Sequence, residues 1–130
     1  MRYLIDTNIV IALTVRDDRA LGRMLRYHRS ESGIPTVVLH ELYAGAYASK
    51  RMRRSLDIIE TLRLPSISFD AEDARAAGEI KAQLKRRGTP IGPNDVLIAG
   101  QARARGLTVV TRNVGEFRRV EGLQVEAWAA

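Results

Sequence analysis

The sequence predicts an α/β fold, with one domain over residues 1–130 and a mainly parallel sheet of about five strands covered by helices on both faces. Short apolar runs of strand length alternate with longer segments of helical spacing, a pattern typical of parallel strands joined by right-handed crossovers. A chain of 130 residues and 14.5 kDa suffices for one hydrophobic core. Polar residues follow several apolar runs, and open α/β sheets bind ligands at the carboxyl ends of their strands.

The first apolar run, Tyr3-Leu4-Ile5, predicts a buried strand that ends at Asp6. A helix is expected to begin at Ile9, with Thr7 or Asn8 as its N-cap. For a lone aspartate in this place, a turn or cap is the simpler explanation. A ligand role for Asp6 therefore requires other acids at the same edge of the sheet.

The next elements are an amphipathic helix that starts at Asp17-Asp18, a break over residues 30–33 and a second strand within 34–39. Residues 40–47 then predict a helix that carries Glu41. Apolar residues flank this glutamate on both sides, and burying it unpaired would be costly. A surface glutamate near arginine partners explains it equally well.

A basic cluster at residues 50–54 leads into another helix, and residues 66–69 predict a third strand. The cluster suits either contact with RNA or a solvated face. Asp70 is the expected N-cap of a long helix over 71–87, which Gly88 ends.

A turn-rich segment, residues 89–94, precedes a helix in which Pro93 suits the first position and Asp95 lies in the first turn. A carboxylate there gains from the helix dipole without any further role. Residues 107–111 predict the fourth strand, and a polar loop over 112–117 carries Glu116. Residues 123–126 predict the last strand.

Four acids are therefore expected at one edge of the sheet: Asp6, Glu41, Asp95 and Glu116. Clustered carboxylates repel one another unless positive charge is present, so the group suits a hard cation. Ligation by oxygen alone points to Mg²⁺, with Mn²⁺ as the other candidate. The net charge of +6, carried mostly by arginine, suits a phosphodiester substrate that such a site would hydrolyse.

The composition excludes several other classes of protein. The absence of cysteine excludes disulfides and thiolate metal sites. The first residues lack the apolar segment of a signal peptide, and no apolar run approaches the length of a membrane span. We expect a cytoplasmic protein with no membrane partner.

Four segments together resemble the PIN-domain ribonucleases, specifically toxins of the VapC type, and the resemblance extends from Met1 to Trp128. The segments are Leu4-Ile5-Asp6-Thr7-Asn8, Glu41-Leu42-Tyr43-Ala44-Gly45, Ile91-Gly92-Pro93-Asn94-Asp95-Val96-Leu97-Ile98-Ala99 and Val110-Thr111-Arg112-Asn113-Val114-Gly115-Glu116-Phe117.

The resemblance implies a three-layer α/β/α fold and an Mg²⁺- or Mn²⁺-dependent endoribonuclease, the toxin of a type II toxin–antitoxin system, that a VapB-type antitoxin inhibits. It makes Asp6 and Asp95 the principal metal ligands and adds Glu41. Many PIN domains have aspartate where this chain has Asn113, so Asn113 and Glu116 share the last position. Thr7, Asn8 and Thr111 are expected to support the site.

The resemblance also implies a homodimer, with Leu42, Tyr43 and Tyr47 as candidates for its apolar surface, although core packing explains these residues equally well. Two other classes of function fit parts of the pattern. A phosphoacceptor receiver domain would share the parallel sheet and the acidic site, but the chain lacks the late lysine that such domains carry. In a non-catalytic RNA-binding module, the four acids would only stabilise the fold at the edge of the sheet.

Overall fold

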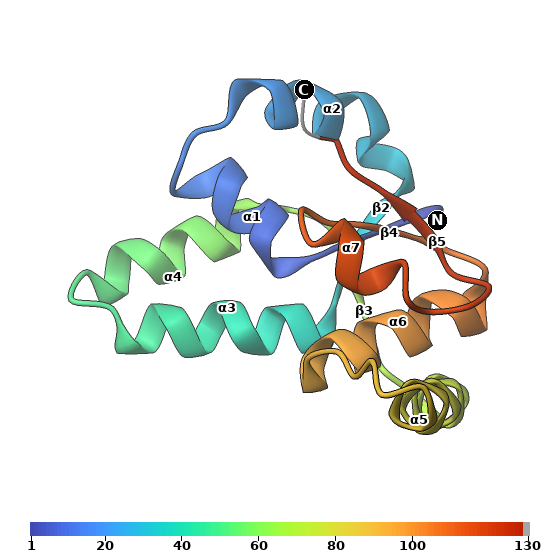
Figure 1. The fold of residues 1–130 in the computed structure, drawn as a ribbon. Helices are drawn as coiled ribbons and strands as arrows, with labels where there is room; N and C mark the ends of the chain where they lie inside the picture. The colour runs from blue at the N-terminus through green and yellow to red at the C-terminus, as the bar shows by residue number, and fades with distance from the viewer. Residues whose placement is uncertain (129–130) are drawn as a thin grey trace.

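Five short parallel strands form the centre of the molecule in a computed structural model that describes residues 1–128 (Figure 1). Ala129 and Ala130, the end of the expected domain, lie outside the described residues. The sheet order is β3-β2-β1-β4-β5, and every neighbouring pair is parallel. The strands are β1 (Tyr3–Ile5), β2 (Ser32–Pro35), β3 (Ser66–Ile67), β4 (Thr108–Val110) and β5 (Gln124–Glu126).

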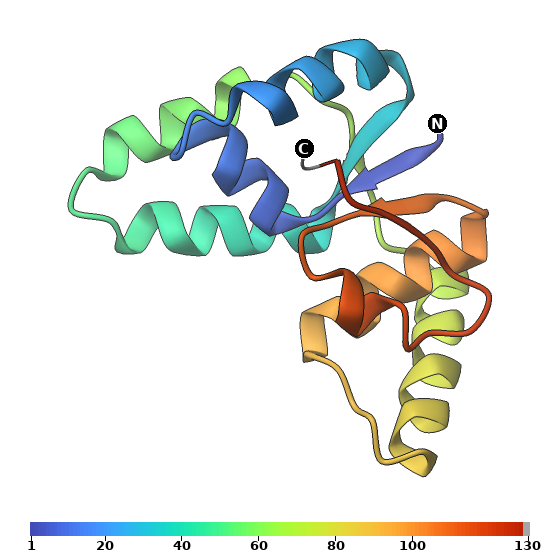
Figure 2. The same cartoon turned by 45° about the horizontal axis from the view of Figure 1, so that its top comes forward.

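The helices cover both faces of the sheet, which confirms the predicted α/β class and its layers. They are α1 (Thr7–Thr14), α2 (Arg19–His28), α3 (Thr36–Ala48), α4 (Met52–Thr61), α5 (Ala71–Arg86), α6 (Pro93–Arg105) and α7 (Val114–Phe117), with a short 3₁₀ turn at Arg29–Glu31. In Figure 1, α2 lies above the sheet and α5 and α6 below it. Figure 2 shows α3 and α4 as a hairpin that projects to one side and α5 projecting to another.

Strand β1 occupies the centre of the sheet because its residues are apolar without interruption. Tyr3, Leu4 and Ile5 are all buried, and β1 pairs with β2 on one side and β4 on the other. A strand covered on both faces needs apolar side chains in both directions. The carboxyl end of β1, and hence Asp6, consequently lies at the middle of the sheet edge.

Several predicted boundaries were wrong, among them the break over residues 30–33, within which β2 already begins at Ser32. The expected strand at 34–39 is β2 only to Pro35, and α3 begins at Thr36 so that Val38 packs in the core. Asp6, rather than Thr7 or Asn8, caps α1. The expected loop at 112–117 contains α7, whose Phe117 is completely buried.

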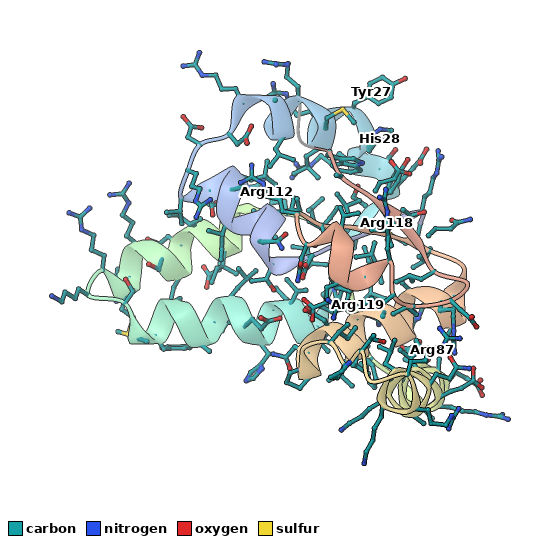
Figure 3. The ribbon with its side chains drawn as sticks, in the orientation of Figure 1. Tyr27, His28, Arg87, Arg112, Arg118 and Arg119 are labelled. Carbon is teal, nitrogen blue, oxygen red and sulfur yellow. The ribbon has the colours of Figure 1, made fainter. Side chains whose placement is uncertain are left out.

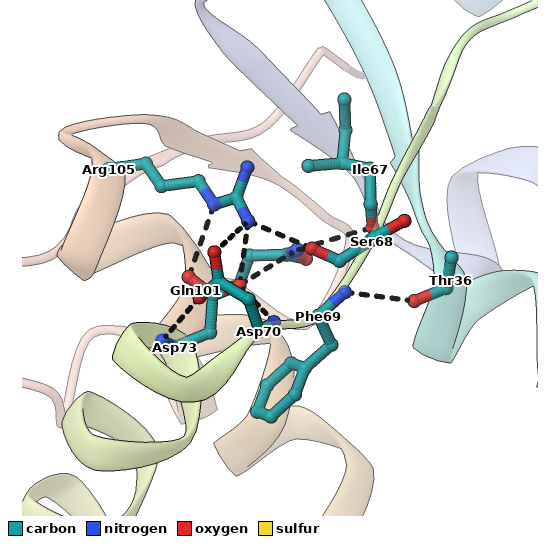
Figure 4. Close-up of polar contacts among 8 residues, drawn as sticks. All are labelled: Thr36, Ile67, Ser68, Phe69, Asp70, Asp73, Gln101 and Arg105. Carbon is teal, nitrogen blue, oxygen red and sulfur yellow. Dashed lines mark hydrogen bonds and ion pairs between the residues drawn. The ribbon is translucent and has the colours of Figure 1, made fainter.

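A buried polar cluster joins α5 to α6 (Figure 4). Asp70 caps α5 as predicted, in a reciprocal capping box with Asp73. The guanidinium of Arg105 donates to both oxygens of Asp73, at 3.1 and 2.8 Å, and Gln101 donates to the carbonyl of Ser68 at 3.0 Å. Burial opposes ionisation of Asp73, but the hydrogen bonds and the charge of Arg105 outweigh it and hold its pKa below the ordinary value.

Helices α5 and α6 also meet at Gly100, where a Cβ atom would lie 2.6 Å from backbone atoms of Ala77. This close approach and the polar cluster fix the direction of α6, whose first turn carries Asp95. Among residues 1–128, no helix combines the length and the apolar character that crossing a bilayer requires.

Candidate active site

Asp6 leaves the end of β1 and serves as the N-cap of α1, with only 3% of its surface exposed. Its Oδ1 accepts from the backbone N–H of Thr7 at 2.8 Å, and its Oδ2 accepts from the hydroxyl of Thr111 at 2.8 Å. Burial raises the pKa of Asp6 although both hydrogen bonds lower it, and the nearby charges of Glu41 and Glu116 raise it further. The capping role and a place in an acidic cluster therefore coexist in one side chain.

Glu41 reaches the same edge from α3, which confirms the prediction that a helix carries it. The hydroxyl of Thr7 donates to its Oε1 at 3.0 Å and so joins the start of α1 to α3. The side chain is half-buried. It forms no ion pair within the part of the chain that the structure describes, so the surface-glutamate interpretation with an arginine partner is wrong.

Asp95 enters from the first turn of α6, as the sequence predicted. Burial raises its pKa to about 7, and the negative charges of Asp6, Glu116 and Glu41 contribute to that rise. Asp95 therefore experiences the charges of acids that come from three other segments of the chain. At neutral pH a substantial fraction of Asp95 is protonated when no cation is bound.

Glu116 and Asn113 both belong to the α7 segment, and they contact each other. Oε1 of Glu116 accepts from the backbone N–H of Gly92, and Oε2 accepts from the side-chain amide of Asn113. A Cβ atom on Gly92 would lie 3.2 Å from Oδ2 of Asp95 and 3.5 Å from Oε1 of Glu116. Gly92 thus lies beside two of the acids, an arrangement that sequence reasoning missed.

Thr111 organises the supporting residues around Asp6. Its hydroxyl oxygen accepts from the side-chain amide of Asn8 at 3.3 Å and from the backbone N–H of Asn113 at 2.9 Å. Because both of these groups are donors, the hydroxyl proton is directed to Asp6. Oδ1 of Asn8 accepts from the backbone N–H of Arg112 at 3.1 Å. The supporting residues predicted from the sequence therefore lie in direct hydrogen-bond contact with the acids or with one another.

The four acids offer the kind of ligand atom that a hard divalent cation prefers. All four acidic side chains offer only oxygen, and none of them pairs with arginine or lysine among the described residues. Protein hydrogen bonds hold Asp6, Glu41 and Glu116. In residues 1–128 no three His, Asp or Glu side chains are gathered closely enough to hold an ion as they stand. The site is therefore acidic and uncompensated, but its side chains are not closed around a common point.

Comparison with known proteins identifies the family and the fold of the chain. Residues 3–123 match the family model described as PIN domain. The chain is 38% identical to the tRNA(fMet)-specific endonuclease VapC of Shigella flexneri, with 99% of each chain covered, and 35% identical to Ribonuclease VapC2 of Haemophilus influenzae, with 98% of each covered. Its fold is similar to that of a protein in the crystal structure of DNA-bound VapBC from Salmonella typhimurium, with a TM-score of 0.96, 36% identity and 99% of each chain covered.

Proposed function

The chain belongs to the PIN-domain family and within it to the VapC ribonucleases, and from this membership we propose that it is the toxin of a type II toxin–antitoxin pair, an endoribonuclease that hydrolyses RNA phosphodiester bonds. The observation that supports the proposal most is the placement of four acids at one edge of the sheet: Thr7 links Asp6 to Glu41, and Gly92 lies beside Asp95 and Glu116. Family membership decides against the receiver domain. The ribonuclease names of the relatives favour catalysis over a non-catalytic RNA-binding module.

We propose that Asp6 and Asp95 are the principal ligands of Mg²⁺ or Mn²⁺, with Glu41 and Glu116 completing the acidic group. When bound, such an ion lowers the pKa of water and stabilises the leaving oxygen of a phosphodiester. Thr111 keeps one oxygen of Asp6 engaged through its hydroxyl proton, and Thr7 orients Glu41. Asn113 donates to Oε2 of Glu116 and contributes no charge of its own.

The partner we propose is a VapB-type antitoxin, in keeping with the VapBC structures to which the fold is similar. A mainly apolar groove of about 300 Å³ lies between α1, α3 and α4, with Val10, Leu42, Ile58 and Ile59 among its lining residues. Thr7 and Glu41 line the same groove, so it opens onto the acidic site. A peptide with apolar side chains and a basic residue at this end would complement both features.

We also propose a homodimer that acts in the cytoplasm, where RNA is available. Of the three residues suggested for the dimer surface, Leu42 is buried in the core. Tyr47 is 64% exposed, and its ring centroid lies 6.4 Å from that of Tyr43. The two tyrosines therefore remain candidates for the dimer surface, whereas Leu42 is explained by packing.

The decisive experiment measures cleavage of tRNA, the substrate class named for the Shigella relative, with Mg²⁺ or Mn²⁺ and with EDTA. We expect Asp6→Asn and Asp95→Asn to abolish cleavage while the circular dichroism spectrum is unchanged. Cleavage at the wild-type rate by both variants would refute the assignment. Millimolar Mg²⁺ should also raise the Tm of the wild type more than that of Asp6→Asn, since a ligand stabilises the state that binds it.

A further inference from the structure

The loop before α6 decides where Asp95 lies. Residues 89–92 join the end of α5 to α6, and the backbone N–H of Val96 donates to the carbonyl of Gly92 at 3.0 Å in the first turn of the helix. Pro93 occupies the first helical position and has no N–H to donate. Any displacement of Gly92 is consequently passed to Asp95, whose Oδ2 would contact a Cβ atom at that glycine.

Two side chains from the α7 segment, three positions apart, hold this loop. Glu116 accepts from the backbone N–H of Gly92, and Nη1 of Arg119 donates to the carbonyl of Pro90 at 3.0 Å. The two contacts are of opposite kind. The carboxylate of Glu116 accepts from an N–H of the loop, whereas the guanidinium of Arg119 donates to a carbonyl of the loop. A spacing of three places both side chains on one side of a helical turn.

Glu116 and Asp95 are both acidic and both lie beside Gly92, where a Cβ atom would be 3.5 Å from Oε1 of Glu116 and 3.2 Å from Oδ2 of Asp95. When both are ionised, repulsion between them favours separation of the loop from α7. The bond from Arg119 does not weaken in this way, since it joins a cation to a backbone carbonyl. Arg119 is therefore suited to keep the loop in place when the acidic site has no cation to offset its charge.

We propose that Arg119 is a positioning residue for the acidic site: by holding the carbonyl of Pro90, it sets the position of Asp95 relative to Glu116. The expected effect on cleavage rests on the proposed nuclease function, whereas the contact between Arg119 and Pro90 does not. Arg118 provides a matched control, because it is an adjacent exposed arginine that forms no side-chain hydrogen bond or ion pair within residues 1–128. Figure 3 shows the two side chains leaving the chain in different directions, with Arg119 on the side of α6.

The test compares Arg119→Ala, Arg119→Lys and Arg118→Ala in the full-length protein. For tRNA cleavage with Mg²⁺ we expect Arg119→Ala to lower kcat about tenfold with little change in KM, as loss of an outer hydrogen bond at a metal site typically does. Arg119→Lys should recover part of kcat, because an ammonium can still donate to the carbonyl. Arg118→Ala should match the wild type. An increase in KM alone, or equal effects of the two alanine variants, would overturn the proposal by making Arg119 an RNA-binding charge.

Two measurements without RNA separate this inference from the proposed function. Titration with Mn²⁺ alone should show weaker binding to Arg119→Ala than to Arg118→Ala. Hydrogen exchange of the Gly92 amide in the metal-free protein should be faster in Arg119→Ala than in Arg118→Ala, because the loop then has one support fewer. If the wild type neither binds Mn²⁺ nor cleaves RNA, the nuclease proposal fails and amide exchange still decides the contact. Equal exchange in the two variants would refute it.

Discussion

Replacing Asp95 by asparagine should stabilise the metal-free protein while it abolishes cleavage. Folding raises the pKa of this acid from 3.8 to about 7, mainly through burial and then through the charges of Asp6 and Glu116. An acid whose pKa is raised binds its proton more tightly when folded, so its ionisation favours unfolding. The loss of stability caused by ionisation of Asp95 is absent below about pH 4 and grows as the pH rises towards 7. It is complete above the pKa of Asp95 in the folded protein.

The size of the effect follows from that pKa. At roughly 1.4 kcal/mol per unit of pKa, the rise corresponds to a loss of stability of at most about 4 kcal/mol. Asp95 is partly exposed, and its interaction with Glu116 is shared between the two groups, so solvent screening reduces this figure. Asparagine also forfeits about 0.3–1 kcal/mol of favourable interaction with the helix dipole. We therefore expect Asp95→Asn to gain about 1–2 kcal/mol in free energy of unfolding at pH 8.

Urea unfolding in EDTA at pH 4 and pH 8 measures this directly. The gain should be present at pH 8 and nearly absent at pH 4. Asp57→Asn is the control, because Asp57 is an exposed aspartate of α4 outside the acidic site. A loss of stability in Asp95→Asn at pH 8, an equal gain at both pH values or the same gain in Asp57→Asn would refute the reasoning.

Three other predictions test the supports of the site. In urea unfolding, Arg105→Ala should lower the free energy of unfolding by about 3 kcal/mol, because it leaves the buried carboxylate of Asp73 without its ion pair. Arg103→Ala breaks a pair with the largely exposed Glu79 and should lower it by less than about 1 kcal/mol. Similar losses in the two variants would contradict this. Gly100→Ala should lower Tm because its Cβ meets backbone at 2.6 Å, whereas Gly78→Ala, with open space around it, should leave Tm unchanged or raise it. Thr111→Val should reduce tRNA cleavage about tenfold with an unchanged far-UV spectrum, since Asp6 loses its hydroxyl donor. Wild-type cleavage by this variant would show that the hydroxyl does not matter.

Those features that depend on neighbours in the sequence were predictable. The apolar run at Tyr3–Ile5 specifies a buried strand, Asp70 specifies a capped helix, and Pro93 with Asp95 specifies a helix start. Each signal acts over a turn or less, through backbone propensity, capping and hydrophobic periodicity. The acids were recognised as a group because parallel strands end at a common edge of the sheet.

Only the tertiary structure decided how those acids are held. The hydroxyl of Thr7 meets Glu41 across 34 positions, Thr111 meets Asp6 across 105 and Gly92 meets Glu116 across 24. No local propensity specifies such contacts, because they form only after the sheet has brought distant segments together. The same reason explains why Asp6, whose capping bond to Thr7 is local, also belongs to the acidic cluster through Thr111. The sequence alone determined which residue types reach this edge of the sheet, and packing decided their partners, their distances and the charge that each one experiences.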